Sequence, residues 1–204
     1  MPRDKSESHR KIIAAASQEF MEKGYAQASM RSIAQKAGMT SAGLYRHFPD
    51  KLSMFASLVD PAISQLTQRL QAHGALVYEM LAKGDLDGIW EDNIESVLFE
   101  TVIYPNFEAF KLILCKSQGT PYAHFVEGLV QEEVRTTMEF LDQAKGGGVP
   151  AHQVRPQELH LLVTAYITAL TESVVHDFTL EETLHYLKTH QAFFKPGFRA
   201  VLGV

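Results

Sequence analysis

The chain has 204 residues, of which 46% are hydrophobic and 21% are charged, and its net charge is −5. This composition is typical of a soluble globular protein with a sizeable core, and it excludes disordered and fibrous classes. No apolar run of about 18 residues is present, so we expect neither a membrane span nor an export signal, and we expect a cytoplasmic protein. A single cysteine excludes an intrachain disulfide and agrees with a reducing compartment.

The charge is unevenly distributed along the chain. Residues 1–51 contain nine Lys and Arg against five Asp and Glu, whereas the remaining residues contain ten against nineteen. A basic amino-terminal quarter on an acidic body is the asymmetry expected of a protein in which only that quarter meets phosphate.

Nearly every segment has helical periodicity, and no alternation of apolar and polar residues is long enough for a sheet, so the sequence predicts an all-α fold. The first helix is expected at about 8–23, with Gly24 as its stop. Ser29 is placed to cap a second helix that ends at Gly38, and Thr40 to cap a short third helix. Three short helices with a tight glycine turn between the last two indicate a helix-turn-helix unit.

The third helix is followed by Pro49-Asp50, and Asp50 is placed to cap the next helix. We therefore predict a helix-turn-helix domain at 1–50 and a larger helical domain at 51–204. The helices expected in the second domain are 51–73 merging into 75–83, 86–103, 105–117, 121–144, 157–176 and 180–195.

The third predicted helix has two unlike faces. At 100° per residue, Leu44 and Phe48 fall together, which predicts that they anchor the helix in a small core. The opposite face combines small residues, which allow close approach to a flat surface, with polar side chains that can reach base edges and phosphates. These outward residues are Ala42, Gly43, Tyr45, Arg46 and His47. The guanidinium of Arg46 can donate two hydrogen bonds to the edge of a guanine in the major groove.

Phosphate contacts are expected around this helix. Ser29 and Thr40 offer hydroxyls and free backbone amides at two helix starts. Lys51 falls in the first turn of the next helix, where a cation opposes the helix dipole unless an anion lies nearby, and a phosphate would supply that anion. An ordinary solvated lysine is the alternative explanation for Lys51 alone.

The segment SMRSIAQKAGMTSAGLYRHFPDK, residues 29–51, resembles the DNA-binding signature of the tetracycline-repressor (TetR/AcrR) family of bacterial transcription regulators. The similarity covers about residues 8–58. It implies double-stranded operator DNA as a partner, a small-molecule effector of unknown identity, repression as the commoner mode of action, and no cofactor. The DNA contacts that it implies fall on Ser29, Arg31, Thr40, Ser41, Ala42, Gly43, Tyr45, Arg46, His47 and Lys51.

A single recognition helix covers only a few base pairs, so we expect a homodimer on a near-palindromic operator. The last two predicted helices carry more apolar residues than one face can hold, which predicts a dimer surface that includes Leu170, Leu184, Leu187 and Phe193. The closing segment FFKPGF, residues 193–198, is similar to that of many family members, in which the two final helices pair with their mates in a four-helix bundle.

The predicted helices between 86 and 144 are rich in aromatic residues, and the resemblance implies a small-molecule pocket in this region, although plain core packing explains most of them. The candidate ligand-binding residues are Trp90, Phe99, Tyr104, Phe107, Phe110, Lys111, Leu114, Phe125 and Tyr166.

Catalysis is not expected. Cys115 lies in the apolar run Leu112-Ile-Leu-Cys115, which predicts a buried and inert thiol. No metal-binding motif is present, and Glu172 with His176 lacks an evident third ligand. The rival class is a helical interaction module that uses the basic segment on a protein or a membrane, but the third helix has no broad apolar stripe for a membrane.

Overall fold

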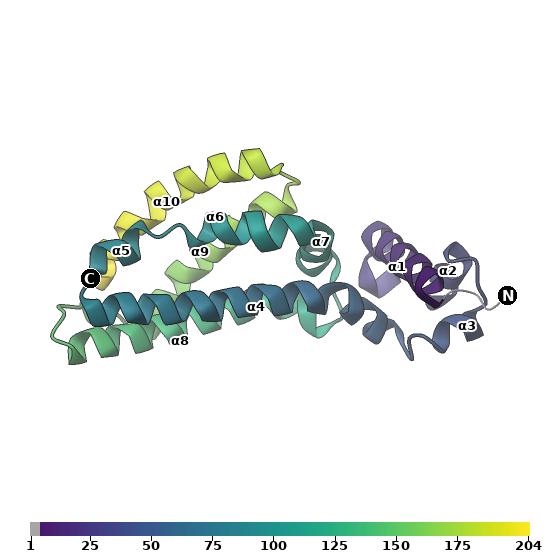
Figure 1. The fold of residues 1–204 in the computed structure, drawn as a ribbon, viewed down its shortest axis with the longest axis horizontal. Coiled ribbons are helices and arrows are strands. Elements are labelled where there is room, and N and C mark those ends of the chain that lie inside the picture. The colour runs from purple at the N-terminus through teal and green to yellow at the C-terminus, as the bar shows by residue number, and fades with distance from the viewer. Residues whose placement is uncertain (1–4) are drawn as a thin grey trace. The chain divides into compact units, whose positions relative to one another are not determined.

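The computed structural model describes residues 5–204, and every regular element among them is helical, which confirms the all-α prediction (Figure 1). The α-helices are α1 (Lys5–Gln27), α2 (Met30–Lys36), α3 (Ser41–Tyr45), α4 (Lys51–Lys83), α5 (Leu86–Glu91), α6 (Ile94–Leu98), α7 (Phe107–Lys116), α8 (Phe125–Gly146), α9 (Pro156–Val175) and α10 (Leu180–Leu202). A π-helical turn follows α6 at Phe99–Ile103, and 3-10 turns occupy Tyr104–Asn106 and Pro121–His124.

The chain divides into two compact units. Unit 1 contains the residues up to Ser64 together with Asn106–Ala123, and unit 2 contains Gln65–Pro105 and His124–Val204. By these contacts, α7 belongs with the amino-terminal helices although it lies in the middle of the chain. The predicted functional division after residue 50 stays a prediction, because compactness does not test which residues carry which function.

The amino-terminal helices end and begin where local chemistry requires. Gly24 has φ +70° and breaks the helical path of α1, and Gly38 has φ +66° in the turn after α2. The Ser29 and Thr40 side chains accept hydrogen bonds from the backbone amides of Ser32 and Gly43, which confirms both predicted caps.

The core of unit 1 is an aromatic cluster. Phe20 of α1 and Phe55 of α4 are fully buried and meet edge to face, with ring centroids 5.1 Å apart. Tyr25 and Tyr122 pack on Phe55 from either end of the cluster. The segment of α7 is tied to α1 by the Ser17 hydroxyl, which donates to Glu108 at 3.0 Å.

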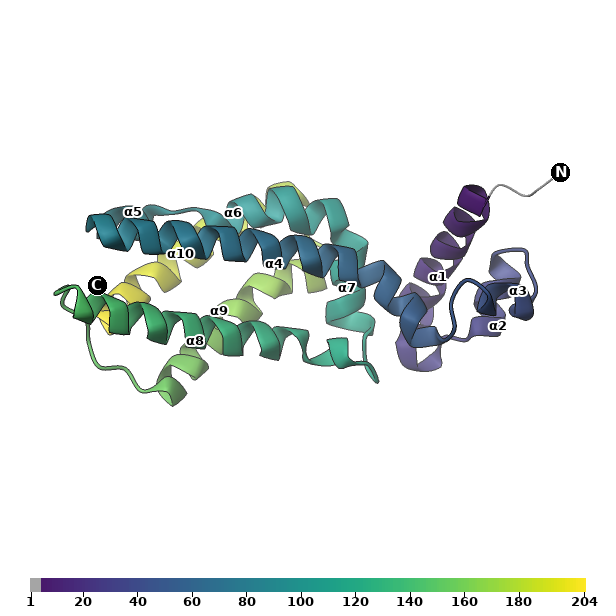
Figure 2. The ribbon, with the colours of Figure 1, turned by 60° about the horizontal axis from the view of Figure 1, so that its bottom comes forward.

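In unit 2, α8 and α9 pack against each other and α9 also contacts α10; Figure 2 shows α9 running obliquely to α8. Their main buried cluster is Val130, Leu141, Val154, Leu159, Val163, Ile167, Leu202 and Val204. The indole N–H of Trp90 donates to the Val204 carbonyl at 2.8 Å, so Trp90 has a structural role in this cluster.

Several predicted boundaries were wrong. The helix expected at 86–103 is interrupted at Asp92 and Asn93, because the Asp92 carboxylate accepts the Ile94 amide and starts a new helix. The helix expected to end at 195 continues through Pro196 to Leu202. Within residues 5–204, no helix is long and apolar enough to cross a membrane.

Candidate nucleic-acid interface

Helix α3 is anchored by one face and open on the other. Leu44 is fully buried and Phe48 is 7% exposed, whereas Tyr45 is 51% exposed. Ala42, Arg46 and His47 are also exposed. The predicted split between anchoring and outward residues is therefore confirmed in this structure.

Glycine at position 43 has a local reason. A Cβ atom there would lie 3.2 Å from the Thr40 hydroxyl, the group that accepts the Gly43 amide at 3.1 Å. A larger residue would press on the cap that starts α3. The Thr40 and Ser29 hydroxyls are thus both engaged as caps, and each can still donate its own proton to another group.

The exposed face carries unneutralised charge. Arg31 on α2 and Arg46 after α3 are exposed, and in the part of the chain that the structure describes neither guanidinium has an ion-pair partner. Ser41, at the first position of α3, is half-buried. Two free guanidinium groups beside a thin polar helix face suit contact with a polyanion.

Lys51 is engaged within the protein. Its ammonium donates to the backbone carbonyls of Tyr25 at 2.7 Å, Ala28 at 3.0 Å and Ala26 at 3.3 Å, and it lies 4.4 Å from the centroid of the Tyr25 ring. The partial negative charge of these carbonyls stabilises the ammonium in the first turn of α4, where the helix dipole disfavours a cation. A phosphate contact by Lys51 stays a prediction, and it requires the ammonium to leave at least one carbonyl.

Glu19 was missed by the sequence analysis. This carboxylate is fully buried and accepts from Lys23 at 2.8 Å, from the Ser32 hydroxyl at 2.8 Å and from Lys36 at 3.1 Å. Burial, the largest single influence, raises the pKa of Glu19, but these hydrogen bonds outweigh it and bring the pKa to about 2. The network joins α1 to both ends of α2. Only the Glu19–Lys23 spacing was visible in the sequence.

The predicted ligand-binding residues do not form one site within either unit. Phe107, Phe110, Lys111 and Leu114 lie on α7 and belong to unit 1, because the apolar face of α7 packs with α1. The other five, Trp90, Phe99, Tyr104, Phe125 and Tyr166, belong to unit 2.

Two of the unit 2 aromatic residues have structural bonds. The Tyr104 hydroxyl bonds to the carbonyls of Phe178 and Thr179 and to the Thr183 hydroxyl, so it secures the turn between α9 and α10. The Tyr166 hydroxyl donates to the buried carboxylate of Glu95 at 2.5 Å. Phe99 is 3% exposed and serves the core.

The predicted dimer residues divide as well. Leu187 is 1% exposed, so it packs inside its own subunit and its assignment to a dimer surface was wrong. Phe193 is 75% exposed, and Leu170 and Leu184 are half-buried. Leu161, which the sequence analysis did not single out, is 70% exposed on α9.

Cys115 is exposed, which contradicts the buried thiol that the sequence predicted, because its position on α7 turns away from the Leu112 and Ile113 side chains. Among residues 5–204, no group of three His, Cys, Asp or Glu side chains is placed to hold a metal ion. The Glu172–His176 pair, 2.9 Å apart, is an exposed ion pair along one helix.

Comparison with known proteins is clearest for unit 1. The profile described as "Bacterial regulatory proteins, tetR family" matches residues 12–58. Over 57 residues the chain is 40% identical to the HTH-type transcriptional repressor BepR of Brucella suis, covering 28% of this chain and 27% of BepR. Over 75 residues it is 36% identical to the transcriptional activator FasR of Mycolicibacterium smegmatis, covering 35% and 33%. The chain thus matches about a third or less of the length of these relatives.

Solved structures extend the similarity of fold to the whole chain. The Pseudomonas aeruginosa repressor MexZ superposes with a TM-score of 0.56 at 16% identity, covering 95% of this chain and 94% of MexZ. A TetR family regulator of Chloroflexus aurantiacus gives 0.56 at 14% identity, covering 98% and 93%. Residues 12–58, which include the signature at residues 29–51, thus match the TetR-family profile, and the whole chain shares the fold of these solved regulators.

Proposed function

We propose that this protein is a sequence-specific DNA-binding transcriptional regulator. The observation that carries the proposal is α3, a helix held from beneath by Leu44 and Phe48 that presents Ala42, Tyr45 and Arg46 outward. A rigid helix with this face fits the major groove of double-stranded DNA, where Arg46 meets base edges.

The neighbouring polar groups would hold the phosphate backbone. Arg31, Ser41 and His47 can each contact a phosphate, and the Ser29 and Thr40 hydroxyls have a proton to donate besides their capping role. In the proposed complex the Tyr45 ring packs against the wall of the groove, and its hydroxyl donates a hydrogen bond to a phosphate oxygen.

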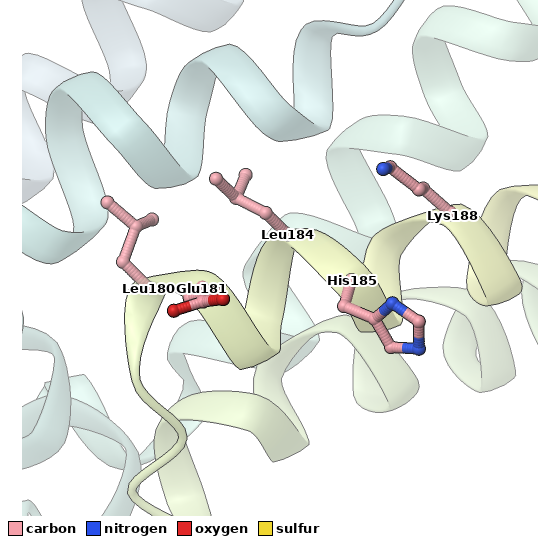
Figure 3. A pocket seen from close by; sticks show the side chains of 5 residues that line it. All are labelled: Leu180, Glu181, Leu184, His185 and Lys188. Atoms are coloured by element: carbon pink, nitrogen blue, oxygen red, sulfur yellow. The ribbon is translucent and has the colours of Figure 1, made fainter.

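Dimerisation is proposed through α9 and α10. Phe193, Leu161, Leu162 and Val201 are exposed apolar side chains on these two helices. Figure 3 shows a depression whose lining residues, Leu180, Glu181, Leu184, His185 and Lys188, all come from α10. A second copy that covers this surface would bring two α3 helices to a near-palindromic operator.

We further propose that a small molecule binds unit 2 and releases the protein from DNA. The relatives include a protein named as a repressor and one named as an activator, and two solved neighbours, NalD and MexZ of Pseudomonas aeruginosa, are named as repressors. Repression is the default mode that we assign by this similarity. Effector and operator weaken each other by the same factor in any such mechanism.

The test begins with selection of bound genomic fragments and continues with titrations on the selected operator and on scrambled DNA. Arg46→Ala should cost about 1 to 3 kcal/mol per half-site and relax the preference at one or two base pairs. Arg135→Ala removes the same charge from an exposed site on α8, where Arg135 pairs with Glu132 and Glu139, and should leave the base preference intact. Equal weakening of both DNAs by Arg46→Ala, without a change of preference, would contradict the proposed reading helix.

A further inference from the structure

Unit 2 holds a polar cluster among its apolar side chains. Glu95 on α6 is 6% exposed, and its two carboxylate oxygens accept from the Tyr166 hydroxyl at 2.5 Å and from the Gln191 amide at 2.9 Å. Both donors are neutral. Within the described residues, Glu95 has no ion-pair partner, which is rare for a buried carboxylate.

A second carboxylate, Glu133 on α8, faces the same cluster. Burial raises the pKa of Glu133, the negative charge of Glu95 raises it further, and Glu133 in turn contributes to the raised pKa of Tyr166. A hydrogen bond with Thr137, one turn along the same helix, lowers the pKa of Glu133 in part.

The surface of Glu133 and the pKa of its carboxyl differ in what they indicate about its surroundings. Its side chain keeps open surface although its carboxyl is desolvated. These two facts agree if that surface faces a confined interior and not the bulk solvent. Neighbouring apolar side chains of α8, Leu129, Val134 and Met138, are likewise only partly buried against the core of unit 2. Glu133 therefore has partly buried apolar side chains as its neighbours along α8.

His190 on α10 supplies an independent observation. It is 2% exposed, and its ring packs at a tilt against Tyr166 and Phe194, with centroids 4.8 and 4.6 Å away. Nε2 lies 3.1 Å from the Tyr166 carbonyl, which can only accept, so Nε2 carries the proton. Burial lowers the pKa of His190 and favours the neutral ring, in which Nδ1 is then an acceptor. Nδ1 is buried and has no hydrogen-bond partner among the described residues.

We propose that the cluster of Glu95, Glu133, Tyr166 and His190 is the effector-recognition site of unit 2 and that its ligand is an amphipathic amine. Nδ1 of His190 is an unmet acceptor, and neither carboxylate has a counter-charge among the described residues. A protonated nitrogen supplies several donors and a positive charge at once. Aromatic rings beside it stabilise a cation and pack against an apolar body. An anionic ligand would add to the repulsion between the carboxylates. This inference rests on the proposed ligand control of a DNA-binding protein.

The experiment uses the full chain and three probes of matched shape and different charge: phenylbutylamine, phenylbutanol and phenylbutyrate. Calorimetry and thermal shift should detect the amine and give at least tenfold weaker binding for the alcohol and none for the acid. Glu133→Gln should reduce amine affinity about tenfold or more. Glu132→Gln is the matched control, because Glu132 is exposed on the same helix and paired with Arg135 at 2.6 Å, and it should bind the amine as the parent chain does.

Equal binding of the amine and the alcohol, or undiminished amine binding by Glu133→Gln, would overturn the assignment, and so would the absence of any amine binding. Affinity of the ligand-free parent protein for its selected operator is measured separately. Loss of the amine result with intact operator binding rejects the ligand class alone, whereas absence of operator binding rejects the proposed function.

Discussion

Each unit buries a glutamate, and the two carboxylates differ in the charge of the groups that donate hydrogen bonds to them. In unit 1, Glu19 is surrounded by two ammonium groups and a hydroxyl. In unit 2, Glu95 has two neutral donors, and a second carboxylate, Glu133, lies near it. A buried charge that its own protein complements has a structural role, whereas one that is left without a counter-charge is available to a partner. The comparison supports the proposal that unit 1 binds DNA as a rigid unit and that unit 2 binds a ligand.

The largest expected effect concerns the complemented charge. Glu19→Gln should lower the free energy of unfolding by up to about 3 kcal/mol at neutral pH, because the difference between a pKa of about 2 and the ordinary 4.5 measures that stabilisation. A depressed pKa stabilises above 4.5, and this stabilisation is lost as pH falls from about 4.5 to about 2. Denaturant titrations of both proteins across that range should therefore converge at low pH.

Glu22→Gln is the control for this prediction. Glu22 lies on the same helix and bonds to Lys36 at 2.6 Å, but it is exposed, so its loss should cost much less stability than the loss of Glu19. If Glu19→Gln proves no more costly than Glu22→Gln, the buried network does not hold α1 to α2 and the contrast between the units fails.

The second effect concerns Lys51. Replacement by Met keeps the apolar stem but removes a charged donor from three carbonyls, which should cost about 2 kcal/mol of stability. If the ammonium stays on these carbonyls in the DNA complex, the slope of log affinity against log salt should be unchanged. A phosphate contact in each subunit of a dimer would instead flatten that slope by about 2. Lys11→Met, at an exposed ion pair with Glu7, controls for the loss of charge.

The helix caps and Lys51 show how far the sequence could predict the structure of unit 1. Caps such as Ser29 and Thr40 follow from contacts within four residues, and so does the outward placement of Tyr45, so all three were predictable. The bonds of Lys51 cross 23 to 26 positions of the chain. No periodicity encodes contacts of that separation.

The candidate ligand site stays a prediction, and its residues divide between the two units for a related reason. Aromatic density predicts burial but not the partner, and Phe110 was grouped with Tyr166 although it packs in the other unit. The polar residues that distinguish the cluster in unit 2, Glu95 and His190, come from helices that are about a hundred positions apart. Their shared burial is a property of the tertiary fold, and the sequence alone shows two ordinary polar residues.

A third and smaller effect tests the neutral pairing of Glu95. Glu95→Gln keeps an oxygen that accepts from Tyr166 and removes a buried charge without a counter-ion, so its cost should stay within about 1 kcal/mol. Tyr166→Phe should be more harmful, at about 1 to 3 kcal/mol, because it leaves a buried carboxylate oxygen without its donor. Unfolding of the two variants in urea gives both values. A cost for Glu95→Gln as large as that of Glu19→Gln would show that the two buried glutamates are alike after all.

The smallest effect has the opposite sign and concerns Glu133. Its pKa is raised in the folded state, first by burial and then by the charges of Glu95 and Glu132, while Thr137 lowers it in part. The folded protein therefore resists ionisation of Glu133, and it loses stability as pH rises from the ordinary 4.5 to the raised pKa. Glu133→Gln should remove this loss and raise the free energy of unfolding at neutral pH by less than about 1 kcal/mol, toward the lower end of the gains that single stabilising substitutions give.

The gain should disappear below the ordinary pKa of 4.5, where the carboxyl is protonated in both the folded and the unfolded state. Urea titrations of the parent chain, Glu133→Gln and Glu132→Gln across this pH range measure it, and Glu132→Gln should give no gain because Glu132 is paired with Arg135 and its pKa is lowered. If Glu133→Gln stabilises the protein, then Glu133 lowers the stability of the fold, as expected of a residue that is retained for binding the effector. A destabilising one would mean that Glu133 already has a favourable partner within the protein, and the unit would then have no uncompensated charge to offer.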